Sequence, residues 1–162
     1  MSDVDAVRRS VRSIASQSPQ VLQHTDTFFV VRAGRLKVRE FADGSGELIA
    51  YDRPDQSGPK TSIYSIVRCD DGHALAGILS RLVPVRGRVV KRRELWMIGR
   101  TRVHLDEVET LGWFVELEVV LGPDEPFESG EREARELMAR LGIEEEALVP
   151  EAYIDLVVSG HG

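Results

Sequence analysis

Much of the chain alternates apolar and polar residues with a period of two. This pattern is typical of strands that have one face in a core and the other face outside it. Residues 34–41, 101–107 and 113–121 show it most clearly, and glycine-containing turns such as residues 42–46 separate several of the runs. We therefore predict strands at residues 26–31, 34–41, 46–53, 61–69, 89–98, 101–107 and 113–121.

Three segments instead repeat apolar residues at helical spacing. The predicted helices are residues 3–14, 73–82 and 131–141. Gly142 is a suitable stop for the last helix, and the tail at 144–156 is expected to form short helical pieces. Strands that neighbour one another in sequence, together with a few amphipathic helices, predict an α+β fold built on an antiparallel sheet or barrel. The length fits a single domain over residues 1–162.

Charged residues occupy the second face of several predicted strands. On any one strand, a solvated outer face would give the same pattern. If the helices cover the apolar faces of a curved sheet, however, the charged faces converge on the concave side and line the interior of a barrel. The residues that share such faces are Arg35, Lys37 and Arg39; Lys91 and Arg93; Arg100, Arg102, His104 and Asp106; and Glu116 and Glu118.

The overall composition makes the cationic faces informative. The 162 residues include 27 Asp and Glu against 21 Lys and Arg, a formal charge of −6, which argues against a general nucleic-acid binder. Cations gathered inside an acidic protein favour a polyphosphate guest. Paired carboxylates in the same cavity favour a divalent cation that bridges to the phosphates. The chain has no Walker loop, so the sequence indicates phosphate chemistry on a different scaffold.

Cysteine content and hydropathy bear on where in the cell the protein is expected. The single Cys69 cannot form an internal disulfide. No apolar run approaches the ~18 residues of a membrane span, and the N-terminus carries no apolar signal core. We therefore expect a soluble cytoplasmic protein without a membrane partner.

The four histidines differ in their surroundings. His104 lies on the same strand face as Asp106, where it could shuttle protons or simply line a tunnel. We expect His24, His73 and His161 to lie at the surface or near the termini.

Six motifs, taken in order, resemble one family. They are Asp26-Thr27-Phe28-Phe29; Gly34-Arg35-Leu36-Lys37-Val38-Arg39-Glu40; Arg53-Pro54-Asp55-Gln56 with Gly58-Pro59-Lys60-x-Ser62-x-Tyr64; Val90-Lys91-Arg92-Arg93; Arg102-Val103-His104-Leu105-Asp106-x-Val108-Glu109-x-Leu111-Gly112; and Glu116-Leu117-Glu118-Val119. Over about residues 3–156 the chain resembles the CYTH, or triphosphate tunnel, superfamily, in its class IV adenylyl cyclase-like branch.

The resemblance implies an eight-stranded antiparallel tunnel barrel with flanking helices. Inner basic residues would grip a triphosphate, and inner carboxylates would bind Mg²⁺ or Mn²⁺. At the matching positions, the implied triphosphate ligands are Lys37, Arg39, Arg53, Lys60, Lys91, Arg93 and Arg102. The implied metal ligands or their supports are Asp106, Glu116 and Glu118. Of all these residues, Lys91, Arg93 and Asp106 are the ones expected to act in catalysis.

The same resemblance implies two reactions. Attack of a ribose 3′-hydroxyl on the α-phosphate of ATP gives cyclic AMP and pyrophosphate, which is the first expectation here. Attack of water on a terminal phosphate gives an inorganic or organic triphosphatase, which is the alternative. Both depend on charge neutralisation and on alignment of the nucleophile.

One motif of the family has no counterpart here. The family begins with a strand that carries Glu-x-Glu-x-Lys, whereas the helix start is already matched at Asp3. The barrel is therefore expected to lack its first strand, together with two metal-binding glutamates and a lysine. A clipped start or a degenerate, non-catalytic triphosphate binder would both explain this. The exposed sheet edge could then pair with a second copy of the chain in a homodimer.

Overall fold

The computed structural model describes residues 4–52, 60–143 and 152–159, with side chains for residues 4–52 and 63–143. Three helices and eight strands form in these ranges. The helices are α1 (Val4–Ile14), α2 (Gly72–Leu82) and α3 (Phe127–Leu141). The strands are β1 (Gln20–Phe29), β2 (Arg35–Phe41), β3 (Gly46–Asp52), β4 (Lys60–Cys69), β5 (Val85–Ile98), β6 (Thr101–Val108), β7 (Gly112–Leu121) and β8 (Ala152–Ser159).

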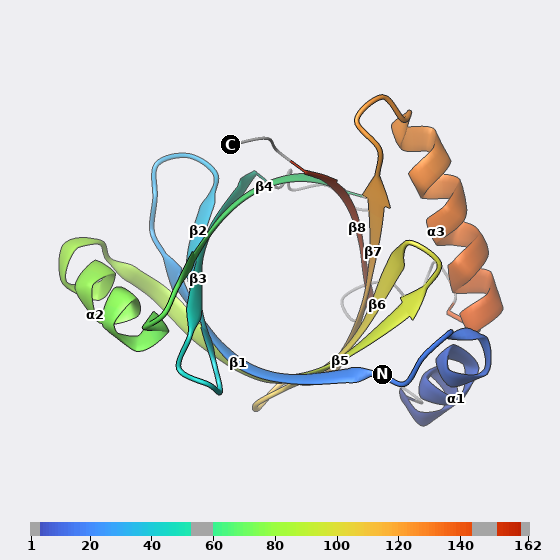
Figure 1. The fold of residues 1–162 in the computed structure, drawn as a ribbon, viewed down its shortest axis with the longest axis horizontal. Coiled ribbons are helices and arrows are strands. Elements are labelled where there is room, and N and C mark those ends of the chain that lie inside the picture. The colour runs from blue at the N-terminus through green and yellow to red at the C-terminus, as the bar shows by residue number, and fades with distance from the viewer. Residues whose placement is uncertain (1–3, 53–59, 144–151, 160–162) are drawn as a thin grey trace.

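The strands close into a barrel in the order β1–β2–β3–β4–β8–β7–β6–β5, seen end-on in Figure 1. β1 to β4 form one meander, and β5 to β7 form a second. β1 joins the two meanders by pairing with β5 along its whole length. All of these pairs are antiparallel, which confirms the predicted α+β barrel with an antiparallel sheet and flanking helices.

The eighth strand comes from the C-terminal segment. β8 lies between β4 and β7 and runs parallel to both. β8 thereby completes the closed barrel. The helical pieces expected at 144–156 are wrong for residues 152–156, and residues 144–151 lie outside the described residues. The expected exposed sheet edge is therefore wrong, because β8 pairs with both β4 and β7 and satisfies their backbone groups.

The helices lie outside the barrel (Figure 1). α2 packs on β2 and β3, α3 packs on β7, and α1 packs on α3. α3 ends at Gly142, which has a positive φ of 71°, as expected for a helix stop. None of the helices in the described ranges is both long and apolar enough to cross a lipid bilayer.

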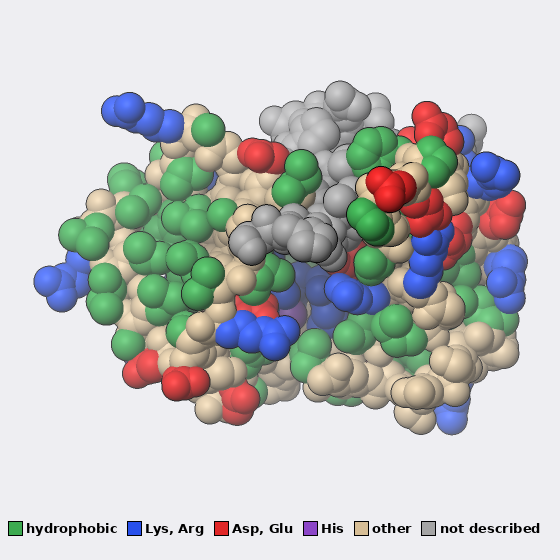
Figure 2. Space-filling view, turned by 45° about the horizontal axis from the view of Figure 1, so that its top comes forward, with side chains coloured by type: hydrophobic (Ala, Val, Ile, Leu, Met, Phe, Trp, Pro, Cys, Tyr) green, Lys and Arg blue, Asp and Glu red, His purple; other side chains and the backbone are tan. Residues whose placement is uncertain are grey.

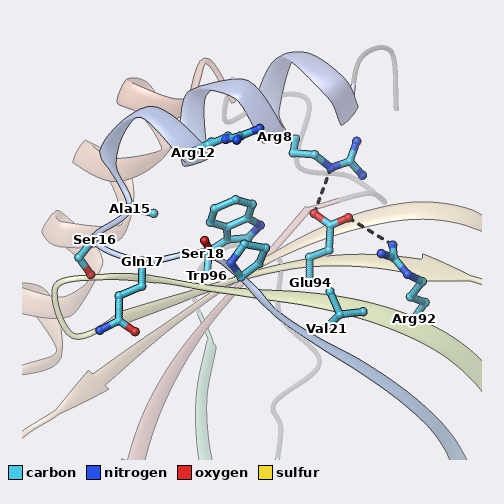
Figure 3. Close-up of a pocket in the computed structure, with 11 residues that line it drawn as sticks. Arg8, Arg12, Ala15, Ser16, Gln17, Ser18, Val21, Arg92, Glu94 and Trp96 are labelled. Atoms are coloured by element: carbon cyan, nitrogen blue, oxygen red, sulfur yellow. Dashed lines mark hydrogen bonds and ion pairs between the residues drawn. The ribbon is translucent and has the colours of Figure 1, made fainter.

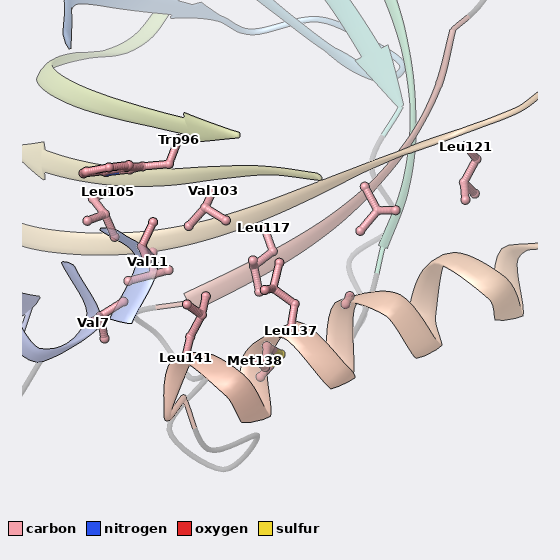
Figure 4. Packing of buried hydrophobic residues seen from close by; sticks show 13 residues of the cluster. Val7, Val11, Trp96, Val103, Leu105, Leu117, Leu121, Leu137, Met138 and Leu141 are labelled. Atoms are coloured by element: carbon pink, nitrogen blue, oxygen red, sulfur yellow. The ribbon is translucent and has the colours of Figure 1, made fainter. Parts of the chain in front are cut away.

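The larger hydrophobic core lies between α1, α3 and the outer faces of β5, β6 and β7 (Figure 4). Its buried strand residues are Trp96, Val103, Leu105, Val115, Leu117, Val119 and Leu121. A smaller core under α2 contains Phe29, Val38 and Ala76. Since alternate residues of a strand point to opposite faces, burial of these side chains on the outside turns the intervening charged residues into the barrel.

Two glycines bring α2 close to the β2–β3 turn. A Cβ atom on Gly46 would lie 2.5 Å from the Cα atom of Gly72, and one on Gly72 would lie 2.8 Å from the Ser45 carbonyl oxygen. Asp71 caps the helix by accepting a hydrogen bond from the Ala74 amide at 2.8 Å. These contacts hold α2 over the outer face of β2, whose inner face carries predicted site residues.

Ion pairs attach α1 to β5 (Figure 3). Glu94 accepts hydrogen bonds from Arg8 at 3.0 Å and from Arg92 at 3.2 Å. The Arg8 guanidinium also lies 4.8 Å from the centre of the Trp113 ring. A cavity of about 680 Å³ remains between the helix and the strand. Its strand residues are Val21 of β1 and Arg92, Glu94 and Trp96 of β5, all on outer faces, so this cavity is separate from the barrel interior.

The core under α1 and α3 provides a test of the fold. Leu117 is fully buried, so Leu117→Ala should lower the free energy of unfolding by about 2–5 kcal/mol through lost burial and a residual cavity. Urea unfolding followed by circular dichroism measures this change. Leu111→Ala is the matched control because Leu111 is 68% exposed, and its effect should stay within about 0.5 kcal/mol. Equal effects of the two substitutions would contradict the assigned core.

Candidate functional site: the charged interior of the barrel

The inner faces of β1, β2, β5, β6 and β7 bring charged side chains from distant parts of the chain together. Figure 2 looks obliquely at one end of the barrel, where Lys, Arg and His side chains lie at the bottom of a hollow. Four cations of the inner faces are nearly buried: the side chains of Lys37, Arg39, Lys91 and Arg93 are between 9% and 13% exposed. Charges at this depth require counter-charges or a ligand.

The first group of ionic contacts joins β1 and β2. Asp26 lies directly opposite Arg39 in the strand register. Arg39 donates from Nε to Asp26 Oδ1 at 2.7 Å and from Nη2 to Oδ2 at 2.8 Å. Lys37 Nζ donates to Oδ2 at 3.0 Å. We call Asp26, Lys37 and Arg39 the first clamp.

The second group joins β5 and β6 with the same atoms in the same roles. Asp106 lies directly opposite Arg93. Arg93 donates from Nε to Asp106 Oδ1 and from Nη2 to Oδ2, both at 2.7 Å, and Lys91 Nζ donates to Oδ2 at 2.9 Å. We call Asp106, Lys91 and Arg93 the second clamp. In both clamps, the lysine and arginine of a Lys-x-Arg sequence donate hydrogen bonds to one aspartate on the adjacent strand.

Two glutamates of β7 extend the second clamp. Glu116 accepts a hydrogen bond from Arg93 Nη2 at 3.1 Å, and Glu118 accepts one from Arg102 at 3.3 Å. His104 lies between them, with one ring nitrogen 3.5 Å from each carboxylate. The two clamps and this group together hold five cations and four carboxylates, so opposite charges nearly balance within these groups.

Asp26, Asp106 and Glu116 are held in their charged form. Burial opposes ionisation of Asp26, but hydrogen bonds from Arg39 and the charge of Lys37 overcome it and hold its pKa well below the usual range. Asp106 has a lowered pKa for the same reason, with Arg93 as the main opposing partner. The pKa of Glu116 is also lowered, because His104 and Arg93 outweigh its burial.

Lys37 also has a perturbed ionisation. Burial lowers the pKa of its ammonium group to about 8, Asp26 opposes this, and the neighbouring charges of Arg39 and Lys91 add to it. The rings of Phe28 and Tyr51 lie 5.5 and 5.7 Å from Nζ and exclude solvent from one side. Lys37 therefore sits in a place that disfavours an uncompensated positive charge.

The predicted metal ligands are only partly free to bind a metal. Within the described residues, no group of three or more His, Cys, Asp or Glu side chains is placed to hold a metal ion. Both oxygens of Asp106 already accept hydrogen bonds from cations. Glu116 and Glu118 remain as a carboxylate pair. Mg²⁺ commonly uses one or two carboxylates together with substrate phosphates, so this pair fits a metal that arrives with a polyphosphate.

The structure brings most of the predicted site residues together. Arg102 lies at the more exposed end, with a side chain that is 44% exposed. Arg53 and the side chain of Lys60 lie outside the described residues. The residues gathered in the barrel interior are Lys37, Arg39, Lys91, Arg93, Arg102, Asp106, Glu116 and Glu118. Their roles in phosphate binding, metal binding and catalysis stay predictions.

Two interior residues were missed by the sequence reasoning. Asp26 was noted in a motif but given no partner, because cross-strand register is not visible in one sequence. His24 was expected at the surface, yet it is only 3% exposed. β1 begins at Gln20, whereas the strand was predicted from Asp26. Extending the alternation back by two residues would have placed His24 on the same inner face as Asp26.

Comparison with known proteins agrees with this geometry. The sequence model of the CYTH domain matches residues 4–153. The chain belongs to the CYTH domain family. Among curated proteins, none matches the chain significantly.

Solved structures share the fold of this CYTH domain at low sequence identity. The PH1012 protein of Pyrococcus horikoshii OT3 superposes with a TM-score of 0.79 and 22% identity, over 88% of this chain and 87% of the other. A conserved hypothetical protein of Pyrococcus furiosus gives 0.74 and 18%, over 89% and 88%. A Vibrio parahaemolyticus protein, described provisionally as an adenylate cyclase, gives 0.65 and 15%, over 91% and 87%. These similarities show the fold alone.

The clamps predict a specific stability effect in the CYTH domain. Asp26→Asn leaves Lys37 and Arg39 buried without a counter-ion, so it should lower the free energy of unfolding by about 3 kcal/mol at pH 7, measured in urea. Because folding lowers the pKa of Asp26 from 3.8, its stabilising effect should be full above pH 4 and decline as the pH falls below that. Asp124→Asn, at an exposed position, is the control. An unchanged free energy of unfolding in Asp26→Asn would mean that Lys37 and Arg39 do not need this carboxylate as a counter-ion.

Proposed function

We propose that the barrel is a triphosphate-binding tunnel and that the protein converts ATP to cyclic AMP and pyrophosphate with the help of a divalent metal. The observation that carries the proposal is the repeated clamp. Two Lys-x-Arg strands, far apart in the sequence, present the same pair of cations to one interior. Arg and Lys side chains match phosphate oxygens in geometry and in charge.

The aspartates of the clamps prepare these cations for a ligand. Asp26 and Asp106 each hold two cations against the strand wall. Their presence lowers the cost of burying like charges and fixes where the donors point. A polyphosphate then needs to compete for donors that are already ordered, so less side-chain entropy is lost on binding.

The charge balance supports a metal as part of the bound state. The clamps and the His104 group have only one more cation than carboxylates. A triphosphate carries several negative charges, which this small excess does not neutralise. We propose that Glu116 and Glu118 hold Mg²⁺ or Mn²⁺, and that Asp106 instead binds and positions Lys91 and Arg93. When bound, the metal would neutralise phosphate charge and polarise the phosphate oxygens.

The chain's own residues would bind and orient the substrate. Lys91 and Arg93 hold the phosphates so that the ribose 3′-hydroxyl faces the α-phosphorus. The bond from that oxygen to phosphorus forms as the bond to the β-phosphate oxygen breaks. Pyrophosphate leaves, and the hydroxyl proton passes to solvent. Positioning and charge stabilisation supply the catalysis, without a covalent protein intermediate. The provisional description of the Vibrio relative as an adenylate cyclase is the reason to test cyclisation before hydrolysis.

Product analysis tests this function. Purified protein with ATP and Mn²⁺ should release cyclic AMP and pyrophosphate in equal amounts, measured by chromatography. Lys91→Ala should weaken triphosphate binding and turnover by about tenfold or more, because a charge-assisted hydrogen bond is lost. Arg92→Ala is the matched control, because Arg92 is on the outer face. Phosphate release from ATP or tripolyphosphate without cyclic AMP would replace cyclisation by hydrolysis. Binding without either product would leave a non-catalytic binder.

Lys37 makes triphosphate affinity depend on pH. Its pKa of about 8 in the free protein means that it loses its charge as the pH rises through 8. Tripolyphosphate favours the charged form, so affinity should fall between pH 7 and 9.5, measured by calorimetry at constant ionic strength. Lys37→Arg keeps the positive charge throughout this range. Because both proteins bind the same ligand at each pH, the difference between their affinities reports the ionisation of Lys37 and not that of tripolyphosphate. Parallel pH profiles for the two proteins would remove Lys37 from the binding site.

A further inference from the structure

His24 lies on the inner face of β1, at the junction of the two clamps. Its neighbour across one edge of β1 is Phe41 on β2, and its neighbour across the other edge is Lys91 on β5. Two residues further along β1 is Asp26, the acceptor of the first clamp. His24 therefore lies between Asp26 of the first clamp, on the same strand, and Lys91 of the second clamp, on the adjacent strand β5.

The ring of His24 is buried without hydrogen bonds. Neither Nδ1 nor Nε2 has a partner among the described residues, although the residue is only 3% exposed. Buried polar atoms are normally paired, and each unpaired one costs free energy. The edge contact with Phe41, at 6.1 Å between ring centres, involves no hydrogen bond to the ring nitrogens. The two unpaired ring nitrogens are therefore an unfavourable arrangement.

Charges from three strands face this ring. Asp26 is on the same strand, Arg39 comes from β2, and Lys91 and Arg93 come from β5. Burial lowers the pKa of His24 to about 3, with the positive charge of Arg39 next in effect and Asp26 opposing both. The ring is therefore neutral at physiological pH. A neutral imidazole has one N–H donor and one acceptor nitrogen.

We propose that His24 is a ligand-binding residue that donates a hydrogen bond to a phosphate oxygen held between the first and second clamps. This inference rests on the proposed function and names the side chain that joins the two halves of the site. Arg39 and Lys91, one cation from each clamp, are the charged neighbours of the ring on β2 and β5. A phosphate that draws both of them from their aspartates comes to lie beside the ring and supplies its missing acceptor.

A packing role for the ring makes a different prediction. If His24 only fills space against Phe41, a phenylalanine at this position should serve equally well. If His24 binds phosphate, His24→Phe should separate stability from binding. Loss of two buried, unpaired nitrogens should leave the ligand-free protein at least as stable as the wild type. Loss of the donor should nevertheless weaken ligand binding.

The experiment measures tripolyphosphate affinity and thermal unfolding in parallel. His24→Phe should weaken binding by about tenfold, because a hydrogen bond to a charged acceptor is lost, without lowering the unfolding midpoint. His24→Gln keeps an N–H donor and should stay within about threefold of the wild type. His73→Ala, at an exposed histidine on α2 with a side chain that is 92% exposed, should change nothing. Equal affinity of His24→Phe and the wild type would overturn the proposal.

A measurement on the unmodified protein covers the case in which His24→Phe does not fold. In ¹⁵N spectra of histidine-labelled protein, the ring nitrogens of His24 should shift when tripolyphosphate binds, because one N–H gains an acceptor. Their unchanged shifts at saturating ligand would also overturn the proposal. Failure of the wild type to bind triphosphate would instead refute the proposed function, so the two failures are distinguishable.

Discussion

The structure depends on the neutralisation of like charges inside a small barrel. Arg39 and Arg93 are each placed directly opposite an aspartate by strand register, and in each strand a lysine two residues earlier reaches the same carboxylate. Without these acceptors, four nearly buried cations would repel one another at short range. A slip of one residue in either strand pair would send the aspartate and its arginine to opposite faces. The charge pattern therefore specifies register as well as function.

This constraint also explains why the apolar residues are outside. An interior occupied by ions cannot serve as the hydrophobic core, so the strands bury their other faces under helices. α1 and α3 cover the second meander and α2 covers the first, which gives two cores of unequal size on either side of the barrel. An acidic chain and a group of buried cations are then compatible, because the net charge is a sum over all residues and does not say where the charges lie.

The sequence predicts which strand residues share a face, but not which residues of different strands contact one another. Alternation identified the inner residues of β2, β6 and β7 because most charged residues of each strand lie on one face and most apolar residues on the other. It placed the start of β1 too late, and so missed His24, because Leu22 and His24 on the inner face break the charged pattern. The pairing of Asp26 with Arg39 and the use of the tail as β8 depend on contacts between distant segments, which one sequence does not display.

Two clamps on adjacent strand pairs also bear on which ligands the tunnel can select. A single phosphate group can satisfy the donors of one clamp only by taking them from an aspartate that already binds them well, so its net gain is small. A chain of phosphates can engage both clamps at once, and the second contact is then intramolecular and loses far less entropy than the first. Two features therefore favour a polyphosphate over a monophosphate: the competition of the aspartate within each clamp, and the presence of two clamps. His24 lies where the two halves of such a ligand would meet.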